Sequence, residues 1–114
     1  MNTNTNLVLS ADQGLIVPLN RLLYIQAKDN ASQLYIEGGR NLLEWKPLKY
    51  FNLMLSDQVG FLRIHRSYIV NRLYVVKSRA NELQLTDGTV LPIGITYKEK
   101  THQWILKPPE NTDR

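Results

Sequence analysis

The chain has 114 residues, which suffices for one domain with its own core but leaves no room for a second domain. It contains no cysteine, so disulfides, thiolate metal ligands and a cysteine nucleophile are excluded. The formal net charge of +4 favours an anionic partner. We find no secretory leader and no apolar run near the roughly 20 residues that span a bilayer, and we expect a cytoplasmic protein without membrane contact.

The first half of the chain predicts a β-meander followed by a helix. Residues 1–6 are polar, and we expect them to form a disordered tail. Strands are expected at 7–10, 15–18, 22–27, 33–37 and 42–45, because each run is apolar or alternating and is bounded by turn-forming residues. Pro47 suits the first turn of a helix, and Leu48, Phe51 and Leu55 recur at helical spacing. A first helix is therefore predicted at about 47–55.

The second half predicts more strands and a final helix. Strands are expected at 62–64, 68–71, 74–77, 82–85 and 90–93, with a typical hairpin turn at 86–89. A second helix is predicted at about 96–106, because Thr96 and Glu99 have capping-box spacing and Pro108 follows its end. One face of this helix would carry Tyr97, Thr101, Trp104 and Ile105. The expected fold is a mainly antiparallel β domain over 7–107, followed by a disordered tail at 108–114.

The most informative stretch is 61–71, which reads Phe-Leu-Arg-Ile-His-Arg-Ser-Tyr-Ile-Val-Asn. Every second residue from Leu62 to Val70 is apolar or aromatic, except that Arg66 stands where an apolar side chain is due. Burial of an unpaired guanidinium is costly. We therefore predict that His65, Arg66 and Ser67 turn or bulge out of the strand and touch a partner, although an ordinary solvated hairpin is an alternative.

Basic residues gather around this triplet. Between residues 58 and 81 there is no Asp or Glu, whereas five cations occur, namely Arg63, Arg66, Arg72, Lys77 and Arg79. A basic segment with hydroxyl and amide neighbours suits phosphates. An anionic membrane surface fits less well, because no amphipathic helix carries these charges.

Enzymatic sites find little support in the sequence, and we expect no catalytic residue, metal, cofactor or small-molecule substrate. His102 lacks a second ligand at helical spacing, and His65 and Ser67 lie two residues apart in an expected turn without an orienting third group. The free N–H groups expected at the start of the last helix, near Thr96 and Tyr97, could instead hold a phosphate with Lys98 beside them.

The run Phe-x-Arg-x-His-Arg-Ser-Tyr-x-Val-Asn at 61–71, followed by Asp87-Gly88 and Leu91-Pro92, resembles the LytTR family of bacterial DNA-binding output domains. The resemblance extends over roughly 7–106 and includes Leu22 to Ile25 ahead of a polar loop. It implies an elongated, antiparallel multi-sheet fold with short helices that binds duplex DNA through loops. It also implies that the chain belongs to a response regulator of a two-component system. Such regulators occupy repeated half-sites in DNA, and the formation of the homodimer can depend on DNA.

In that family three loops reach the DNA, and two of them enter successive major grooves. Here they would be 28–33, 65–67 and 94–97, with Arg66 reading guanine and Ser67 binding a phosphate. The residues expected at the DNA are Lys28, Asn30, Ser32, Gln33, Arg63, His65, Arg66, Ser67, Thr96, Tyr97 and Lys98.

The chain departs from the family at Gly94 and Ile95, where members usually carry a serine followed by an arginine. Thr96 or Lys98 could take over the lost contact, Ile95 could pack on a thymine methyl, or the loop could have given up specific contact. The departure also keeps open a protein-interaction module on the same fold with lost or relaxed DNA specificity. Family members usually add a receiver domain or membrane segment, for which this chain has no room, so we expect either a receiver-free regulator or an excised output domain.

Overall fold

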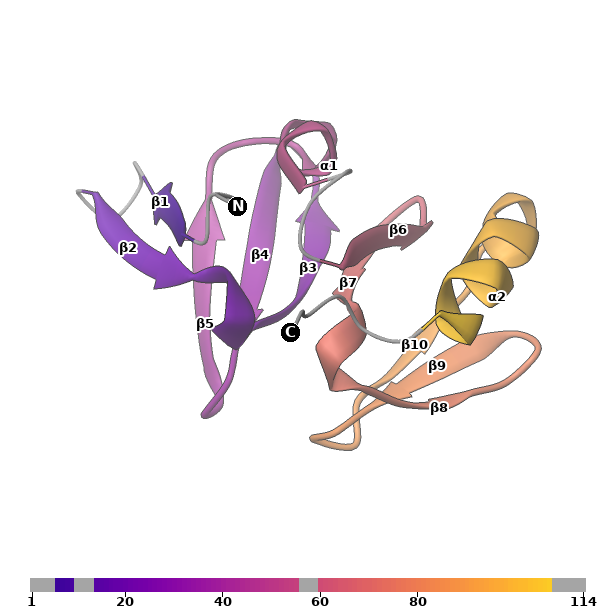
Figure 1. Ribbon diagram of the computed structural model, residues 1–114. Coiled ribbons are helices and arrows are strands. Elements are labelled where there is room, and N and C mark those ends of the chain that lie inside the picture. The colour runs from indigo at the N-terminus through magenta and orange to yellow at the C-terminus, as the bar shows by residue number, and fades with distance from the viewer. Residues whose placement is uncertain (1–5, 10–13, 56–59, 108–114) are drawn as a thin grey trace.

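A computed structural model describes residues 6–9, 14–55 and 60–107 of the chain (Figure 1). Three antiparallel sheets and two α-helices make up the fold. The strands are β1 (Asn6–Leu9), β2 (Leu15–Pro18), β3 (Leu22–Lys28), β4 (Ala31–Ile36), β5 (Arg40–Glu44), β6 (Phe61–His65), β7 (Tyr68–Asn71), β8 (Val75–Ser78), β9 (Glu82–Leu85) and β10 (Val90–Pro92). The helices are α1 (Leu48–Leu55) and α2 (Lys98–Leu106), and the 3₁₀ turns are η2 (Leu19–Arg21), η3 (Arg72–Tyr74) and η4 (Ile95–Tyr97). The predicted mainly antiparallel fold with two short helices is confirmed.

The central sheet has the strand order β5-β4-β3-β7-β6 and is covered on both faces. Successive residues of a strand point to opposite faces, so Ile25 and Ile69 contribute to one core while Tyr24 and Val70 contribute to the other. The first core is closed by α1 and by the hairpin of β1 and β2. The second is closed by α2 and by the small sheet of β8, β9 and β10. The molecule is a flat slab with extents of 39 × 37 × 25 Å. It is therefore extended along two axes, whereas the sequence predicted an elongated shape.

Two β-bulges shift the alternation of buried residues. In β3 the register passes from Leu22 to Tyr24, which leaves Leu23 as the extra residue, and Leu23 and Tyr24 both enter the second core. In β6 the register passes from Arg63 to His65, and the extra residue Ile64 is fully buried in the same core. The second bulge lies directly before the turn at residues 66 and 67, so the prediction that the chain turns out of the strand at the basic triplet is confirmed.

Several boundaries differ from the sequence prediction. Strand β4 begins at Ala31, so the expected loop 28–33 is reduced to Asp29 and Asn30. Asp29 takes a φ of 57°, a left-handed conformation that Asp tolerates better than most residues. Asn6 belongs to β1 rather than to a tail, whereas residues 1–5, 10–13 and 108–114 lie outside the described part of the chain.

The start of the second helix was predicted wrongly. The chain enters α2 through η4, the N-cap is Tyr97, and no side chain caps the helix, so Thr96 and Glu99 do not form a capping box. The N–H of Lys98 donates to the carbonyl of Ile95, which uses one of the groups that a cap would have served. The predicted buried face of the helix is confirmed, because Thr101 is buried and Trp104 and Ile105 pack on the second core.

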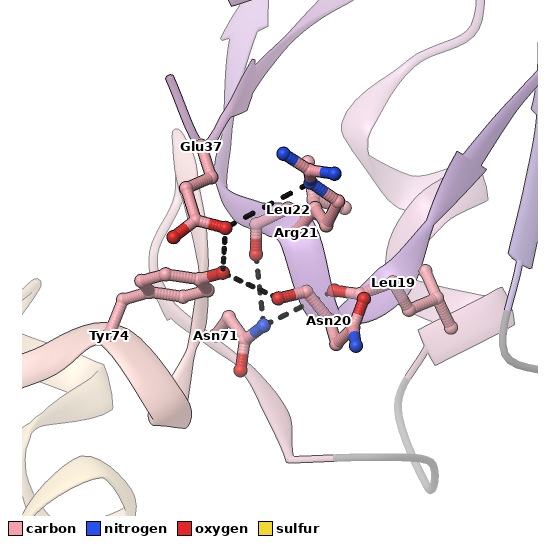
Figure 2. Close-up of polar contacts among 7 residues, drawn as sticks. All are labelled: Leu19, Asn20, Arg21, Leu22, Glu37, Asn71 and Tyr74. Carbon is pink, nitrogen blue, oxygen red and sulfur yellow. Dashed lines mark hydrogen bonds and ion pairs between the residues drawn. The ribbon is translucent and has the colours of Figure 1, made fainter. Parts of the chain in front are cut away.

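A polar cluster around the buried side chain of Asn71 ties the two halves of the molecule together (Figure 2). The amide nitrogen of Asn71 donates to the carbonyls of Leu19 at 3.3 Å and Leu22 at 2.9 Å, and its oxygen accepts from the N–H of Leu73 at 3.0 Å. Nearby, the Tyr74 hydroxyl donates to the carbonyl of Asn20 at 2.5 Å. The motif asparagine is therefore structural, since it joins the end of β7 to the turn that precedes β3.

The tyrosines that face the second core pack on one another. The rings of Tyr24 and Tyr35 are stacked with centroids 4.3 Å apart, and Tyr68 tilts against Tyr24 at 6.2 Å. Burial, and then the neighbouring Tyr35, raise the pKa of Tyr24 to about 12. These rings form interstrand packing rather than an exposed stacking platform.

The raised pKa of Tyr24 predicts a loss of stability in strong base. The folded state holds this proton more tightly than the unfolded chain, so the contribution is complete below pH 10 and is lost as the pH rises toward 12. We expect the free energy of unfolding to fall by on the order of 2 kcal/mol across this interval. Urea unfolding at pH 9, 10 and 11 measures the effect, and Tyr24→Phe should flatten the slope. Equal slopes for the two proteins would contradict this assignment.

Candidate nucleic-acid interface

Three chain segments meet at one side of the central sheet, where β3 ends and β7 begins. We call this side the edge. Gln26 of β3 pairs with Tyr68 of β7, so the end of β3 lies beside the start of β7. The N–H of Ala27 donates to the carbonyl of Ser67 at 2.9 Å, which joins the end of β3, just before the β3–β4 turn, to the β6–β7 turn. The N–H of Gly94 donates to the carbonyl of Ile64 at 2.8 Å, which joins the segment before α2 to the same hairpin. Figure 1 shows the β6–β7 turn and the start of α2 on the same side of the molecule.

The β6–β7 turn is held by its own side chains. The guanidinium of Arg63 donates to the carbonyl of Arg66 at 2.5 Å and to that of His65 at 3.3 Å. The Nδ1 atom of His65 accepts from the N–H of Ser67 at 3.0 Å, and the His65 ring lies 5.5 Å from the ring of Tyr68. Arg63 and His65 thus shape the turn. Arg66 is exposed, and no other described residue bonds its side chain.

The β3–β4 turn presents a smaller polar set than the sequence predicted. Lys28 and Asn30 are exposed at the edge, together with Asp29. Gln33 lies within β4, where its amide donates to the Oδ1 atom of Asn41 at 2.7 Å. Ser32 is 0% exposed, and its hydroxyl donates to the carbonyl of Lys46 at 2.7 Å. The expected DNA contact by Ser32 is therefore wrong, because this hydroxyl fastens β4 to the end of β5.

The third segment is a close-packed turn. A Cβ atom at position 94 would lie 2.9 Å from the Cδ2 atom of Tyr97 and 3.5 Å from the Cα atom of His65, so Gly94 allows this approach. The N–H of Tyr97 donates to the carbonyl of Gly94, and it is not free for a phosphate as expected. Thr96 is exposed and Lys98 is half-buried. Ile95, which precedes them, is 85% exposed.

The end of β5 adds residues that the sequence analysis missed. Glu44 pairs with Ser32, so Trp45 and Lys46 emerge at the edge that carries the β3–β4 turn. Trp45 is 73% exposed, and the ammonium of Lys46 lies 5.1 Å from the ring centroid of Tyr50. The signal was available, because a predicted meander places the end of its last strand beside the start of the preceding strand.

The basic segment at 58–81 does not form one continuous surface. Arg63 and Arg66 lie at the edge just described. Arg72 donates to the carbonyl of Ile105 at 3.1 Å and so fastens α2 to η3. Lys77 and Arg79 belong to β8 and the residues after it, in a different sheet. The cations at the edge itself therefore come from several segments, namely Lys28, Lys46, Arg63, Arg66 and Lys98.

No group of three His, Asp or Glu side chains among the described residues is arranged to hold a metal ion. The Nε2 atom of His102, on α2, lies 3.4 Å from the carbonyl of Arg79. In the same described part, no helix is long and apolar enough to span a membrane.

Comparison with known proteins identifies the family. The model of the LytTr DNA-binding domain matches residues 12–106. The chain therefore belongs to the LytTR family and carries a DNA-binding domain; this family is not a family of enzymes. Among solved structures, the fold is similar to a LytTr DNA-binding domain from Bacillus cereus, part of a protein named as a methyl-accepting/DNA response regulator, with a TM-score of 0.75 and 23% sequence identity. That match covers 90% of this chain and 98% of the other. The comparison with curated proteins found no match to this chain.

Proposed function

We propose that this domain is a sequence-specific reader of duplex DNA, acting as the output domain of a bacterial transcriptional regulator in the cytoplasm. One observation carries the proposal: backbone hydrogen bonds fasten three turns at one edge of the sheet, and Arg66 is exposed in the middle turn. A rigid edge can hold several side chains in the geometry that base readout requires. The family membership supports DNA as the partner.

The residues at the edge divide into two roles. Arg66 can bond a guanine at two atoms in the major groove, and Asn30 can do the same with an adenine. Lys28, Ser67, Thr96 and Lys98 bring cations and hydroxyls that suit backbone phosphates, which position a protein without reading sequence. Arg63 and His65 contribute by holding the β6–β7 turn in shape. Gln33, half-buried in β4, and Tyr97, packed over Gly94, would contact DNA only at the margin of this surface.

The DNA target would be a pair of spaced half-sites, each bound by one copy of the domain. Two copies on one duplex would then form a homodimer that depends on DNA. The regulator would act in a two-component system, as expected for this family.

Selection of sites from a random duplex pool at physiological salt tests the proposal. We expect the domain to enrich paired half-sites with a fixed spacing, and binding to weaken steeply with salt. A folded domain that enriches no sequence would contradict the proposal. That outcome would favour the protein-interaction module. The exposed Ile95, which stands where family members carry a cation, supports this alternative.

A further inference from the structure

Ile95 is the most exposed of the large hydrophobic side chains in the described part of the chain, at 85%. Folding gains nothing from an isoleucine in water, and the residue packs on neither core. Its position in a closely packed turn distinguishes it from most other exposed apolar residues. It directly follows Gly94, whose N–H is bonded to Ile64 and whose missing side chain brings the segment against His65.

The backbone around Ile95 is fixed rather than free. The carbonyl of Ile95 accepts the N–H of Lys98, and the carbonyl of Gly94 accepts the N–H of Tyr97 at 2.9 Å. Strand β6 contacts both η4 and α2. The side chain is therefore presented from a set position, next to the turn that carries Arg66.

We propose that Ile95 reads a thymine by packing on its C5-methyl group in the major groove. This inference rests on the proposed function, because it places Ile95 on the edge assigned to DNA. The chemistry leaves one target, since the edges of unmodified base pairs in the major groove carry donors, acceptors and a single apolar group, the thymine methyl. A phosphate offers nothing to an aliphatic side chain, and the exposed γ and δ carbons of isoleucine suit a methyl contact.

Deletion of single methyl groups from both partners tests this contact. The duplex enriched by the wild-type domain is remade with each thymine replaced in turn by deoxyuridine, which removes only the methyl group. Dissociation constants are then measured for the wild type and for Ile95→Ala. We expect one thymine in each half-site at which the replacement weakens wild-type binding about fourfold, the factor that corresponds to burial of one methyl group. Ile95→Ala should bind the two duplexes equally.

A matched variant controls for unspecific losses. Val76 is another exposed aliphatic residue, but it lies on β8, away from the edge, so Val76→Ala should keep the full thymine effect. Because Ile95 is exposed, Ile95→Ala should fold normally, which circular dichroism would verify.

The outcomes separate this inference from the proposed function. If sites are enriched but no thymine replacement matters, or if the effect persists in Ile95→Ala, the methyl contact is wrong while the proposed function stands. If Ile95→Ala binds every duplex as the wild type does, Ile95 faces another partner and the inference is likewise overturned. If the folded wild type enriches no site, both fall together.

Discussion

Arg66→Ala is expected to lower the affinity for the selected duplex about tenfold to a hundredfold, while affinity for a mixed-sequence duplex falls only two- to threefold. The loss of affinity for the selected duplex corresponds to one bidentate contact between arginine and guanine. The loss for the mixed-sequence duplex corresponds to one exposed positive charge. The difference arises because Arg66 is exposed in a turn that other residues hold in shape. Fluorescence anisotropy with both duplexes at the same salt concentration measures the two effects.

Arg40→Ala is the matched control for that experiment. Arg40 is an exposed arginine of the same sheet, but it starts β5 and pairs with Ile36 at the end opposite the three turns. Its removal deletes the same charge and should change both affinities equally and by no more than about twofold. Equal losses of specific and mixed-sequence binding in Arg66→Ala would show that Arg66 contributes only charge, and direct readout by this residue would then be wrong.

Asn71→Ala is expected to lower the free energy of unfolding by about 3 kcal/mol, the largest stability effect that we predict. The substitution leaves two buried carbonyls, those of Leu19 and Leu22, and the N–H of Leu73 without their partner. Unsatisfied buried groups are costly because water cannot replace the lost bonds. Urea unfolding monitored by tryptophan fluorescence measures the loss.

Asn41→Ala provides the comparison for Asn71. The Asn41 amide is exposed and accepts one hydrogen bond from Gln33, so its removal should cost no more than about 0.5 kcal/mol. A loss below 1 kcal/mol in Asn71→Ala would contradict the structural role of the polar cluster in Figure 2. DNA binding by the folded Asn71→Ala protein should be retained at low temperature, because Asn71 lies at the end of β7 away from the turns.

The fold was largely predictable because its strands and helices obey simple periods. Apolar alternation and turn residues located most strands, and Leu48, Phe51 and Leu55 identified α1. The bulges at Leu23 and Ile64 were not predictable, since they depend on which residues the neighbouring strands pair with. The 3₁₀ turn that precedes α2 was also missed, because the spacing of Thr96 and Glu99 in the sequence resembles a capping box.

The candidate site was predictable only where a residue breaks a pattern. Arg66 interrupts an apolar alternation, and the cost of burying it was enough to predict a turn. Ser32 gave no such signal: a serine next to turn-forming residues is typical of a loop, and its partner carbonyl at Lys46 is 14 residues away. The predicted meander already placed Trp45 at this edge, whereas its exposure could not be predicted, because it depends on how β5 ends beside β4.

The most direct test of the account is a titration of the ¹⁵N-labelled domain with its selected duplex, followed by amide chemical shifts. The account predicts that the large changes fall at 28–30, 65–67 and 94–98, the segments that meet at one edge of the central sheet. Changes should be small at 38–40 and 86–88, in turns away from that edge. Large changes centred on the outer face of α1 or on the sheet of β8, β9 and β10, with the three turns unaffected, would contradict it.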